Sequence, residues 1–286
     1  MKLLRSYYLL CKPNVVYMML ITALVGMLLA QETVPSISYM FIALLGIALC
    51  SGSAAAINQV IDRSADAAMN RTDKRPLPQG DISPIHASIF ALVIGFLGAL
   101  ILYIYVNTLT MYLTIASLIG YAFIYTVYLK RATPQNIVIG GLAGAAPPLL
   151  GWTSMTNSID AYSLLLVLII FIWTPPHFWA LAIYRKDEYA KESIPMLPVT
   201  HGVAFTKLQI VLYTIILFLV SLLPYIVLMS GVIYLISALV LSTVFLYYSI
   251  KLYLGEGDEY AMKTFTYSIY YIFLIFIALL ADHFIL

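Results

Sequence analysis

The feature of this sequence that most limits its fold is a series of long apolar runs spread along the whole chain. A helix needs roughly 17–25 apolar residues to cross the ~30 Å hydrocarbon core of a bilayer. Nine runs approach or meet that length, at residues 14–30, 39–61, 85–106, 111–129, 136–155, 161–183, 207–229, 232–254 and 264–281. Hydrophobic residues make up 63% of the chain and charged residues 10%, which excludes a water-soluble domain. We therefore predict an all-α, polytopic membrane protein with about nine transmembrane helices, forming a single domain over residues 1–286.

The basic residues lie on one side of this predicted layout. Lys2, Arg5 and Lys12 precede the first run, and every later Lys or Arg falls in or beside a connection on the same side. The opposite connections carry only Glu32 and Asp160 as charges. Because cytoplasmic loops are enriched in Lys and Arg, we expect a cytoplasmic N-terminus and an external C-terminus. The first run lacks a small-x-small cleavage site, so we expect it to be retained as a span. No Arg- and Ser-rich transit segment precedes it, so we expect a bacterial plasma (inner) membrane protein.

Net charge and cysteine spacing exclude several function classes. The formal net charge of +2 gives no reason to expect nucleic-acid binding. Cys11 and Cys50 form no CxxC or Cys/His spacing, so neither cysteine redox chemistry nor a thiolate metal site is expected. No soluble region or internal repeat is visible in the sequence, so function must reside in loops and helix ends.

Polar side chains concentrate after the second run, at Asn58, Asp62 and Asp66. In a helix, a four-residue step turns the side chain by only about 40°, so the three form one polar stripe if the helix continues beyond the run. Oxygen ligands of this kind suit Mg²⁺, which takes one or two carboxylates plus phosphate oxygens and waters. The alternative is a solvated helix end whose carboxylates pair with nearby arginines. Because polar groups at the hydrocarbon boundary are costly, the metal site is favoured.

Basic residues follow the stripe and also end the fourth run on the same side. They are Arg71, Lys74 and Arg75, then Lys130 and Arg131. Since guanidinium forks bind pairs of phosphate oxygens, we interpret Arg71, Arg75, Lys130 and Arg131 as diphosphate-binding and leave Lys74 unassigned. The cytoplasmic charge bias is the alternative explanation.

A second polar face begins inside the sixth run. A helix extended from His177 places Glu188 and Lys191 within about 40° of it and Asp187 about 80° to one side. Lys191 is a further candidate for diphosphate binding. An intramembrane histidine is a functional candidate by default, and the alternative is a neutral histidine hydrogen-bonded to a neighbouring helix.

Two proline pairs fall inside predicted spans. Pro147 and Pro148 lie in the fifth run, and Pro175 and Pro176 lie in the sixth. Since proline removes a helical hydrogen bond and clashes with the preceding turn, we expect both helices to kink and to leave room for a ligand.

These residues resemble the signatures of the UbiA-type intramembrane prenyltransferases, through the Asn58, Asp62 and Asp66 spacing and the acidic pair Asp187 and Glu188. Four longer blocks are similar to one branch of that family, the protohaem IX farnesyltransferases (haem O synthases). They are NRTDKRPLP at 70–78, YTVYLKRATPQNIVIGGLAGAAPP at 125–148, TPPHFWALAI at 174–183 and IPMLP at 194–198.

The resemblance implies transfer of a farnesyl group from farnesyl diphosphate to a vinyl carbon of haem b, with a hydroxyl added from water, giving haem O. It implies a Mg²⁺ cofactor and assigns catalytic and metal-binding roles to Asn58, Asp62 and Asp66 at one site and to Asp187, with Glu188, at a second. Basic residues would stabilise the leaving diphosphate.

Against the wider family, His177 stands where a carboxylate would begin the second motif, which predicts that it binds haem. The expected partners are farnesyl diphosphate, haem b and the lipid bilayer, with no nucleic acid. A homo-oligomer, or an association with haem A synthase or a terminal oxidase, is compatible with the resemblance. The alternatives are a related prenyltransferase for an aromatic or quinone precursor, an ion-coupled transporter and a non-catalytic assembly factor.

Overall fold

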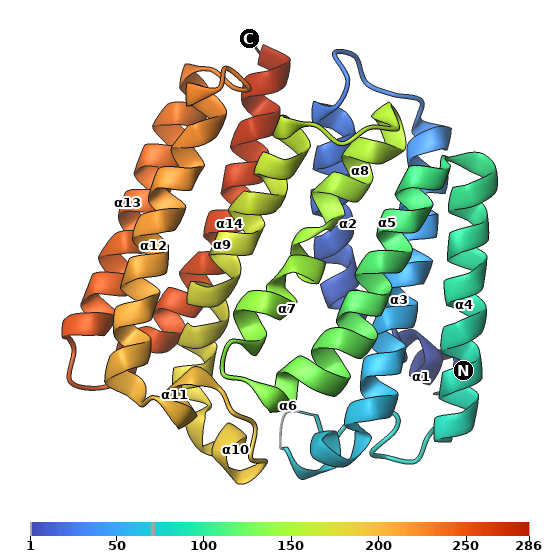
Figure 1. Ribbon diagram of the computed structural model, residues 1–286, viewed down its shortest axis with the longest axis vertical. Helices are drawn as coiled ribbons and strands as arrows, with labels where there is room; N and C mark the ends of the chain where they lie inside the picture. The colour runs from blue at the N-terminus through green and yellow to red at the C-terminus, as the bar shows by residue number, and fades with distance from the viewer. Residues whose placement is uncertain (1, 70–71, 286) are drawn as a thin grey trace. The chain divides into compact units, whose positions relative to one another are not determined.

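Helices account for nearly all of the structure. The computed structural model describes residues 2–69 and 72–285, and no strand occurs in those ranges (Figure 1). The elements are α1 (Lys2–Leu10), α2 (Pro13–Leu29), α3 (Ile37–Ala68), α4 (Pro84–Tyr105), α5 (Thr108–Ile119), η1 (Gly120–Leu129), α6 (Lys130–Ala132), α7 (Asn136–Ala145), α8 (Pro147–Thr156), α9 (Ala161–Tyr184), α10 (Lys186–Lys191), α11 (Leu197–Thr200), α12 (Val203–Ile226), α13 (Val232–Leu254) and α14 (Glu259–Ile285). The predicted all-α class is confirmed.

The predicted membrane spans correspond to these helices. Within the described residues, eight helical stretches are long and apolar enough to cross a membrane. The pair α1 and α2, bent by 51°, makes a ninth if it crosses as one span. The largest differences from the predicted limits are at α3, which continues to Ala68, and at α14, which begins at Glu259. The polytopic membrane class is therefore confirmed.

The helices group into two compact units. Unit 1 holds the chain up to Leu129 together with Ala146–Ile159, and unit 2 holds Lys130–Ala145 together with the chain from Asp160 onward. One boundary falls between α7 and α8, inside the fifth predicted run. A single domain over the whole chain stays a prediction from the sequence.

Small residues bring the helices of unit 1 close together. A Cβ added to Gly151 on α8 would lie 1.9 Å from the Ala23 carbonyl oxygen on α2, so these two backbones are in direct contact. Ser53 on α3 donates a hydrogen bond to the Ala91 carbonyl on α4 at 2.7 Å. Because lipid tails are as apolar as the side chains, close backbone approach and interhelical hydrogen bonds stabilise such packing.

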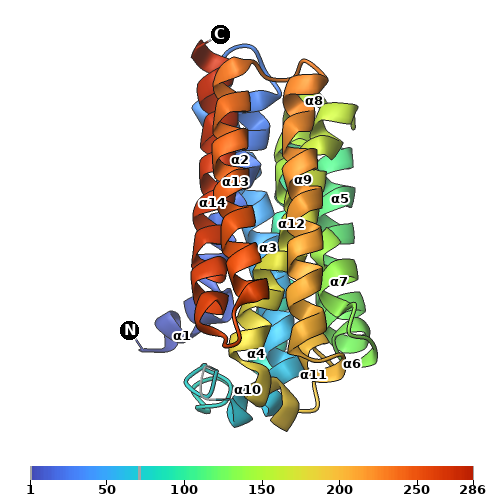
Figure 2. The same cartoon turned by 90° about the vertical axis from the view of Figure 1, so that its left-hand side faces the viewer.

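Buried hydroxyl groups join the helices of unit 2. Thr214 and Ser249 link α12 to α13 at 3.0 Å, and Ser221 and Ser242 link the same helices at 3.0 Å. The Tyr234 hydroxyl donates to the Ser221 carbonyl at 2.7 Å. Figure 2 shows α13 and α14 running side by side along their length.

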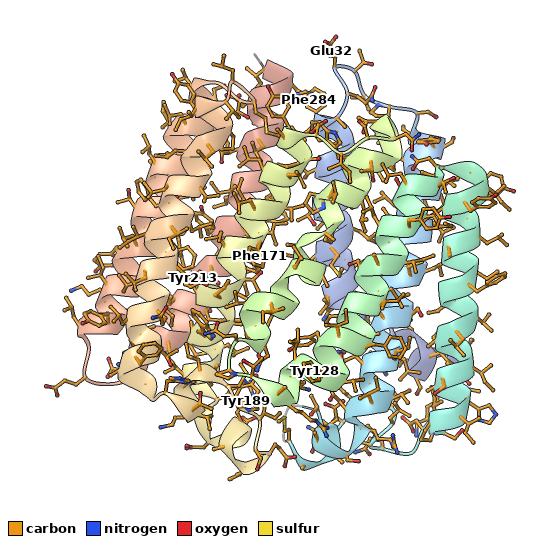
Figure 3. The ribbon with its side chains drawn as sticks, in the orientation of Figure 1. Glu32, Tyr128, Phe171, Tyr189, Tyr213 and Phe284 are labelled. Carbon is orange, nitrogen blue, oxygen red and sulfur yellow. The ribbon has the colours of Figure 1, made fainter. Side chains whose placement is uncertain are left out.

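Each unit has two distinct ends. In unit 1, Glu32 in the loop between α2 and α3 lies at the end opposite Tyr128 (Figure 3). In unit 2, Phe284 near the end of α14 lies opposite Tyr189 on α10 (Figure 3). The C-terminal part of α3 therefore lies at the Tyr128 end of unit 1, and the loop after α9 lies at the Tyr189 end of unit 2.

The proline pairs act differently from each other. In the fifth run, α7 ends at Ala145 and α8 begins at Pro147, so the helix is interrupted at the proline pair where a kink is expected. In the sixth run, α9 continues as one helix through Pro175 and Pro176, whose rings are buried. Buried helices tolerate proline because their neighbours can satisfy the freed carbonyls. The π-helix η1 in the fourth run was not predicted.

Candidate functional site

The polar stripe lies on the last turns of α3 in unit 1. Asn58, Asp62 and Asp66 are 4%, 2% and 5% exposed, and the helix that carries them continues to Ala68. The predicted continuation of the helix is thus observed. Of the alternative, the arginine pairing is present at Asp66, which contacts Arg75, whereas exposure to solvent is not, because all three side chains are buried. Burying a carboxylate near the hydrocarbon core costs free energy, and buried carboxylates in membrane helices are typical of functional sites.

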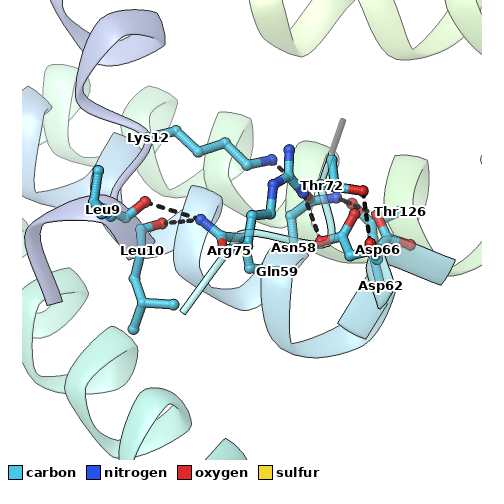
Figure 4. Close-up of polar contacts among 10 residues, drawn as sticks. All are labelled: Leu9, Leu10, Lys12, Asn58, Gln59, Asp62, Asp66, Thr72, Arg75 and Thr126. Carbon is cyan, nitrogen blue, oxygen red and sulfur yellow. Dashed lines mark hydrogen bonds and ion pairs between the residues drawn. The ribbon is translucent and has the colours of Figure 1, made fainter. Parts of the chain in front are cut away.

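A hydrogen-bond network joins the first part of the stripe to two other segments (Figure 4). The Lys12 ammonium donates to Asn58 Oδ1. Asn58 Nδ2 donates to Asp62 Oδ2 at 3.0 Å and to Thr126 Oγ1 at 3.0 Å. Thr126 comes from η1, where its hydroxyl donates to the Tyr121 carbonyl at 2.8 Å. A π-helix often marks a functional site, and here it places Thr126 on Asn58.

The end of the stripe is held by the loop that follows α3. Arg75 Nη1 contacts Asp66 Oδ2 at 2.6 Å, and the two side chains are 21% and 7% exposed. Thr72 Oγ1 donates to the Asp66 carbonyl at 2.9 Å. Lys74 is exposed. The predicted diphosphate ligand Arg71 lies outside the described residues.

The junction of α1 and α2 lies against the same turn of α3. Lys12 has a positive φ of 49° between the two helices. Gln59, the neighbour of Asn58, donates to the carbonyls of Leu9 and Leu10, both at 3.0 Å. In the sequence Lys12 was only one of the cytoplasmic charges. No local signal could have linked it, or Thr126, to the stripe.

The charges and donor types of this cluster fit a magnesium diphosphate. Two carboxylates, Asp62 and Asp66, lie with two cations, Lys12 and Arg75, so their formal charges cancel. In the part of unit 1 that the structure describes, no three His, Cys, Asp or Glu side chains come together. Mg²⁺ needs only one or two carboxylates when phosphate oxygens complete its shell, so this set of oxygens suits it.

The second acidic motif lies in unit 2, after α9. Asp187 on α10 is exposed, whereas Glu188 accepts from Arg185 Nη1 at 3.1 Å and 3.3 Å through its two oxygens. Lys191 at the end of α10 is exposed. The structure therefore leaves the Asp187 carboxylate and the Lys191 ammonium accessible. It gives Glu188 a partner from within the chain.

The basic pair at the start of unit 2 lies on the short helix α6. Lys130 is half-buried and Arg131 is exposed. Asn136, at the beginning of α7, is fully buried, and its Nδ2 donates to the Thr133 carbonyl at 2.9 Å. Among the described residues, Asn136 Oδ1 is one of few buried acceptors without a hydrogen-bond donor. This amide carbonyl is a polar group that the prediction missed.

His177 lies within α9 and is 7% exposed. Its ring stacks on Trp173 with a centroid distance of 4.2 Å and on Phe265 with one of 4.6 Å. His177 Nδ1 lies 2.6 Å from Ser268 Oγ on α14. The hydrogen bond to a neighbouring helix, which was the alternative to a functional role, is therefore present.

Comparison with known proteins gives one family. Residues 19–280 match the model of the UbiA prenyltransferase family. "Protoheme IX farnesyltransferase 2" of Pseudoalteromonas atlantica is 58% identical over 280 residues, which is 98% of this chain and 92% of that protein. "Protoheme IX farnesyltransferase 1" of Pseudomonas fluorescens is 60% identical over 282 residues, covering 99% and 94%.

Solved structures share the fold at low identity. A structure described for digeranylgeranylglyceryl phosphate synthase has a TM-score of 0.84 and 19% identity, with 100% of both chains covered. A UbiA homologue from Archaeoglobus fulgidus bound to GPP and Mg²⁺ has a TM-score of 0.68 and 16% identity, with 96% of this chain and 99% of that chain covered.

Proposed function

The chain belongs to the UbiA prenyltransferase family, and from this premise we propose that it transfers a farnesyl group from farnesyl diphosphate to the vinyl group of haem b (protohaem IX), forming haem O. The observation that carries the proposal is identity of 58% and 60%, over nearly the full length, to proteins named protoheme IX farnesyltransferase. The buried carboxylates of α3 are consistent with it, because a prenyl diphosphate and its metal need such a site at a membrane boundary.

The residues of the stripe would hold the metal. Asp62 and Asp66, with the Asn58 amide oxygen, offer the hard oxygen ligands that Mg²⁺ prefers. A related structure is described as bound to GPP and Mg²⁺. When bound, Mg²⁺ neutralises charge on the leaving diphosphate. Asp187, with Glu188, is proposed for a second ion, and the exposed Asp187 carboxylate is available for it.

Basic side chains would bind the diphosphate. In unit 1 this role falls to Arg75, which already contacts Asp66 at the end of the stripe, and to Arg71. In unit 2 it falls to Lys130, Arg131 and Lys191. Arginine suits this role because its planar fork can bind two phosphate oxygens at once.

The reaction breaks the allylic carbon–oxygen bond, and the electron pair leaves with the diphosphate. One vinyl carbon of haem b forms the new carbon–carbon bond, and water adds to the other vinyl carbon with loss of a proton. Cations that surround the diphosphate stabilise the charge it gains. Apolar helices exclude bulk water, which would otherwise quench the allylic cation early.

His177 is proposed as the haem-contacting residue, and its hydrogen bonds suit that role. Ser268 Oγ lies 2.6 Å from both the Phe265 carbonyl oxygen and His177 Nδ1, and its hydroxyl has one proton to donate. With that proton on the Phe265 carbonyl, His177 Nδ1 donates to Ser268 Oγ. A neutral imidazole with its proton on Nδ1 keeps the lone pair on Nε2, which is the state that can bind iron.

The protein is a multi-pass membrane enzyme. We propose that it lies in the bacterial plasma membrane with its N-terminus and the stripe on the cytoplasmic side, as the distribution of Lys and Arg indicates. Association with itself, with haem A synthase or with a terminal oxidase is a proposal from the resemblance alone.

The function is tested with purified protein, haem b, farnesyl diphosphate and Mg²⁺. Haem O, identified by mass, should form and should disappear when the metal is chelated. An aromatic acid or quinone precursor offered in place of haem b is the control. Prenylation of that precursor, without haem O formation, would move the protein to another branch of the family.

A further inference from the structure

Lys12 contacts the polar stripe of α3 from another part of the chain. It is half-buried at the junction of α1 and α2, and its ammonium donates to Asn58 Oδ1. Gln59 holds the end of α1 through the carbonyls of Leu9 and Leu10. Figure 4 shows Lys12 and Arg75 pointing toward the same group of side chains. Two cations therefore lie at the carboxylate stripe.

The partners of Asn58 fix the direction of its amide. Its Oδ1 faces the Lys12 ammonium, and its Nδ2 faces Asp62 Oδ2 at 3.0 Å and Thr126 Oγ1 at 3.0 Å. The opposite orientation would place an NH₂ group on an ammonium and an oxygen on a carboxylate. Neither contact can form a hydrogen bond, so the orientation shown is the one that the network allows.

This orientation makes Lys12 and a metal ion compete for Asn58. If the ion binds Oδ1 where it now lies, two cations share one oxygen, and the positive charge of the ammonium repels the ion. If the amide turns so that Oδ1 joins Asp62 in holding the ion, the NH₂ group turns onto the ammonium. In both cases the ammonium opposes the ion at Asn58, which favours movement of Lys12 away from Asn58 when the ion binds.

We propose that Lys12 is a positioning residue that holds the Asn58 oxygen while the site is metal-free and moves to an oxygen of the diphosphate once Mg²⁺ is bound. This inference rests on the proposed function, since it needs a metal–diphosphate substrate at the stripe. Lysine suits the exchange because its ammonium is a compact charge on a flexible stem.

The proposal gives opposite effects for one substitution. Removing the Lys12 charge removes a competitor, so a metal ion offered alone should bind tighter. The same change removes a ligand of the diphosphate, so the diphosphate should bind more weakly. A residue that only packs α1 against α3 would not shift the two affinities in opposite directions.

The experiment uses the purified full-length protein and Lys12→Gln, with Lys2→Gln as the matched control. Lys2 lies on α1, and its contact with Asp81 is at the surface, where the lysine side chain is 85% exposed. Mn²⁺ binding without diphosphate, measured by electron paramagnetic resonance, should tighten about tenfold in Lys12→Gln, because a positive charge beside the site is lost. In saturating Mg²⁺, the affinity for inorganic pyrophosphate should fall by about tenfold or more. Lys2→Gln should change neither affinity, and Lys12→Arg should retain wild-type Mn²⁺ affinity.

A measurement on the unaltered protein does not depend on how the variants fold. The rate at which an amine-reactive reagent labels Lys12 should rise with Mg²⁺ alone and fall when pyrophosphate is added, while labelling of Lys2 stays constant. Equal or weaker Mn²⁺ binding by Lys12→Gln, or constant labelling of Lys12, would overturn the exchange. Absence of Mn²⁺ binding by the wild-type protein, both with and without pyrophosphate, would instead overturn the metal site at the stripe, and haem O formation by the same preparation tests the proposed function separately.

Discussion

The contact between α2 and α8 in unit 1 predicts a large stability loss from one added methyl group. A Cβ on Gly151 would lie 1.9 Å from the Ala23 carbonyl oxygen, and one on Gly26 would lie 2.1 Å from the Pro148 carbonyl oxygen. The two glycines thus lie in a reciprocal contact between α2 and α8. Since each obstacle is backbone rather than a flexible side chain, Gly151→Ala cannot be accommodated by a rotamer change.

The size of the loss follows from the displacement that the methyl group requires. Ordinary van der Waals contact begins at 3.4 Å, so a gap of 1.9 Å must open by 3.4 − 1.9 = 1.5 Å. Ala23 and Leu150 belong to the buried cluster at this interface, and Met27 packs with them. A gap of even 0.5–1 Å loses about a quarter to a half of each dispersion contact. With the usual overpacking cost of about 1–3 kcal/mol, we expect Gly151→Ala to lower the free energy of unfolding by about 3 kcal/mol.

The assay is reversible unfolding in mixed micelles with rising SDS, followed by tryptophan fluorescence. Trp152, next to Gly151 on α8, is 6% exposed and reports on this interface. The control is Gly144→Ala on α7, where an added Cβ meets nothing within 4 Å. That variant should be unchanged or more stable by up to about 1 kcal/mol, because alanine favours the helix. Wild-type stability of Gly151→Ala, or an equal loss in Gly144→Ala, would refute the packing argument.

Further predictions concern the site and its orientation. Asp62→Asn should insert and purify normally yet lose haem O formation by a factor of about 10² or more, because a buried carboxylate that would hold the metal is neutralised; near-normal turnover measured by mass spectrometry would contradict the metal site. Single cysteines at Asp160 and Asp73, probed with a membrane-impermeant maleimide, should label from opposite sides, and labelling of both from outside would remove the proposed topology. His177→Ala should weaken haem binding about tenfold or more, seen as a changed haem spectrum, and leave farnesyl diphosphate affinity unchanged. Loss of farnesyl diphosphate affinity, with a change in its Mg²⁺ dependence, would assign His177 to the diphosphate site, and normal binding of both ligands with normal turnover would make it a packing residue.

Local patterns in the sequence determined the membrane fold and the position of the stripe. In lipid, a helix must satisfy the hydrogen bonds of its own backbone, so a long apolar run predicts a helix directly. For this reason α13 occupies the predicted range Val232–Leu254. The four-residue spacing of Asn58, Asp62 and Asp66 determined that they share one face, and α3 does continue to present them so. The sequence blocks at 70–78, 125–148, 174–183 and 194–198 were sufficient to predict the enzyme family.

The partners of the stripe were decided by tertiary structure alone. Lys12 and Asn58 are 46 positions apart, and Asn58 and Thr126 are 68 apart. Lys12 reaches the stripe because the chain bends between α1 and α2, and Thr126 does so from the π-helix η1. Periodicity describes only the few turns of helix around a residue, so it cannot show which distant side chain meets which. The direction of the Asn58 amide, and with it the competition between Lys12 and a metal ion, depends on those distant partners.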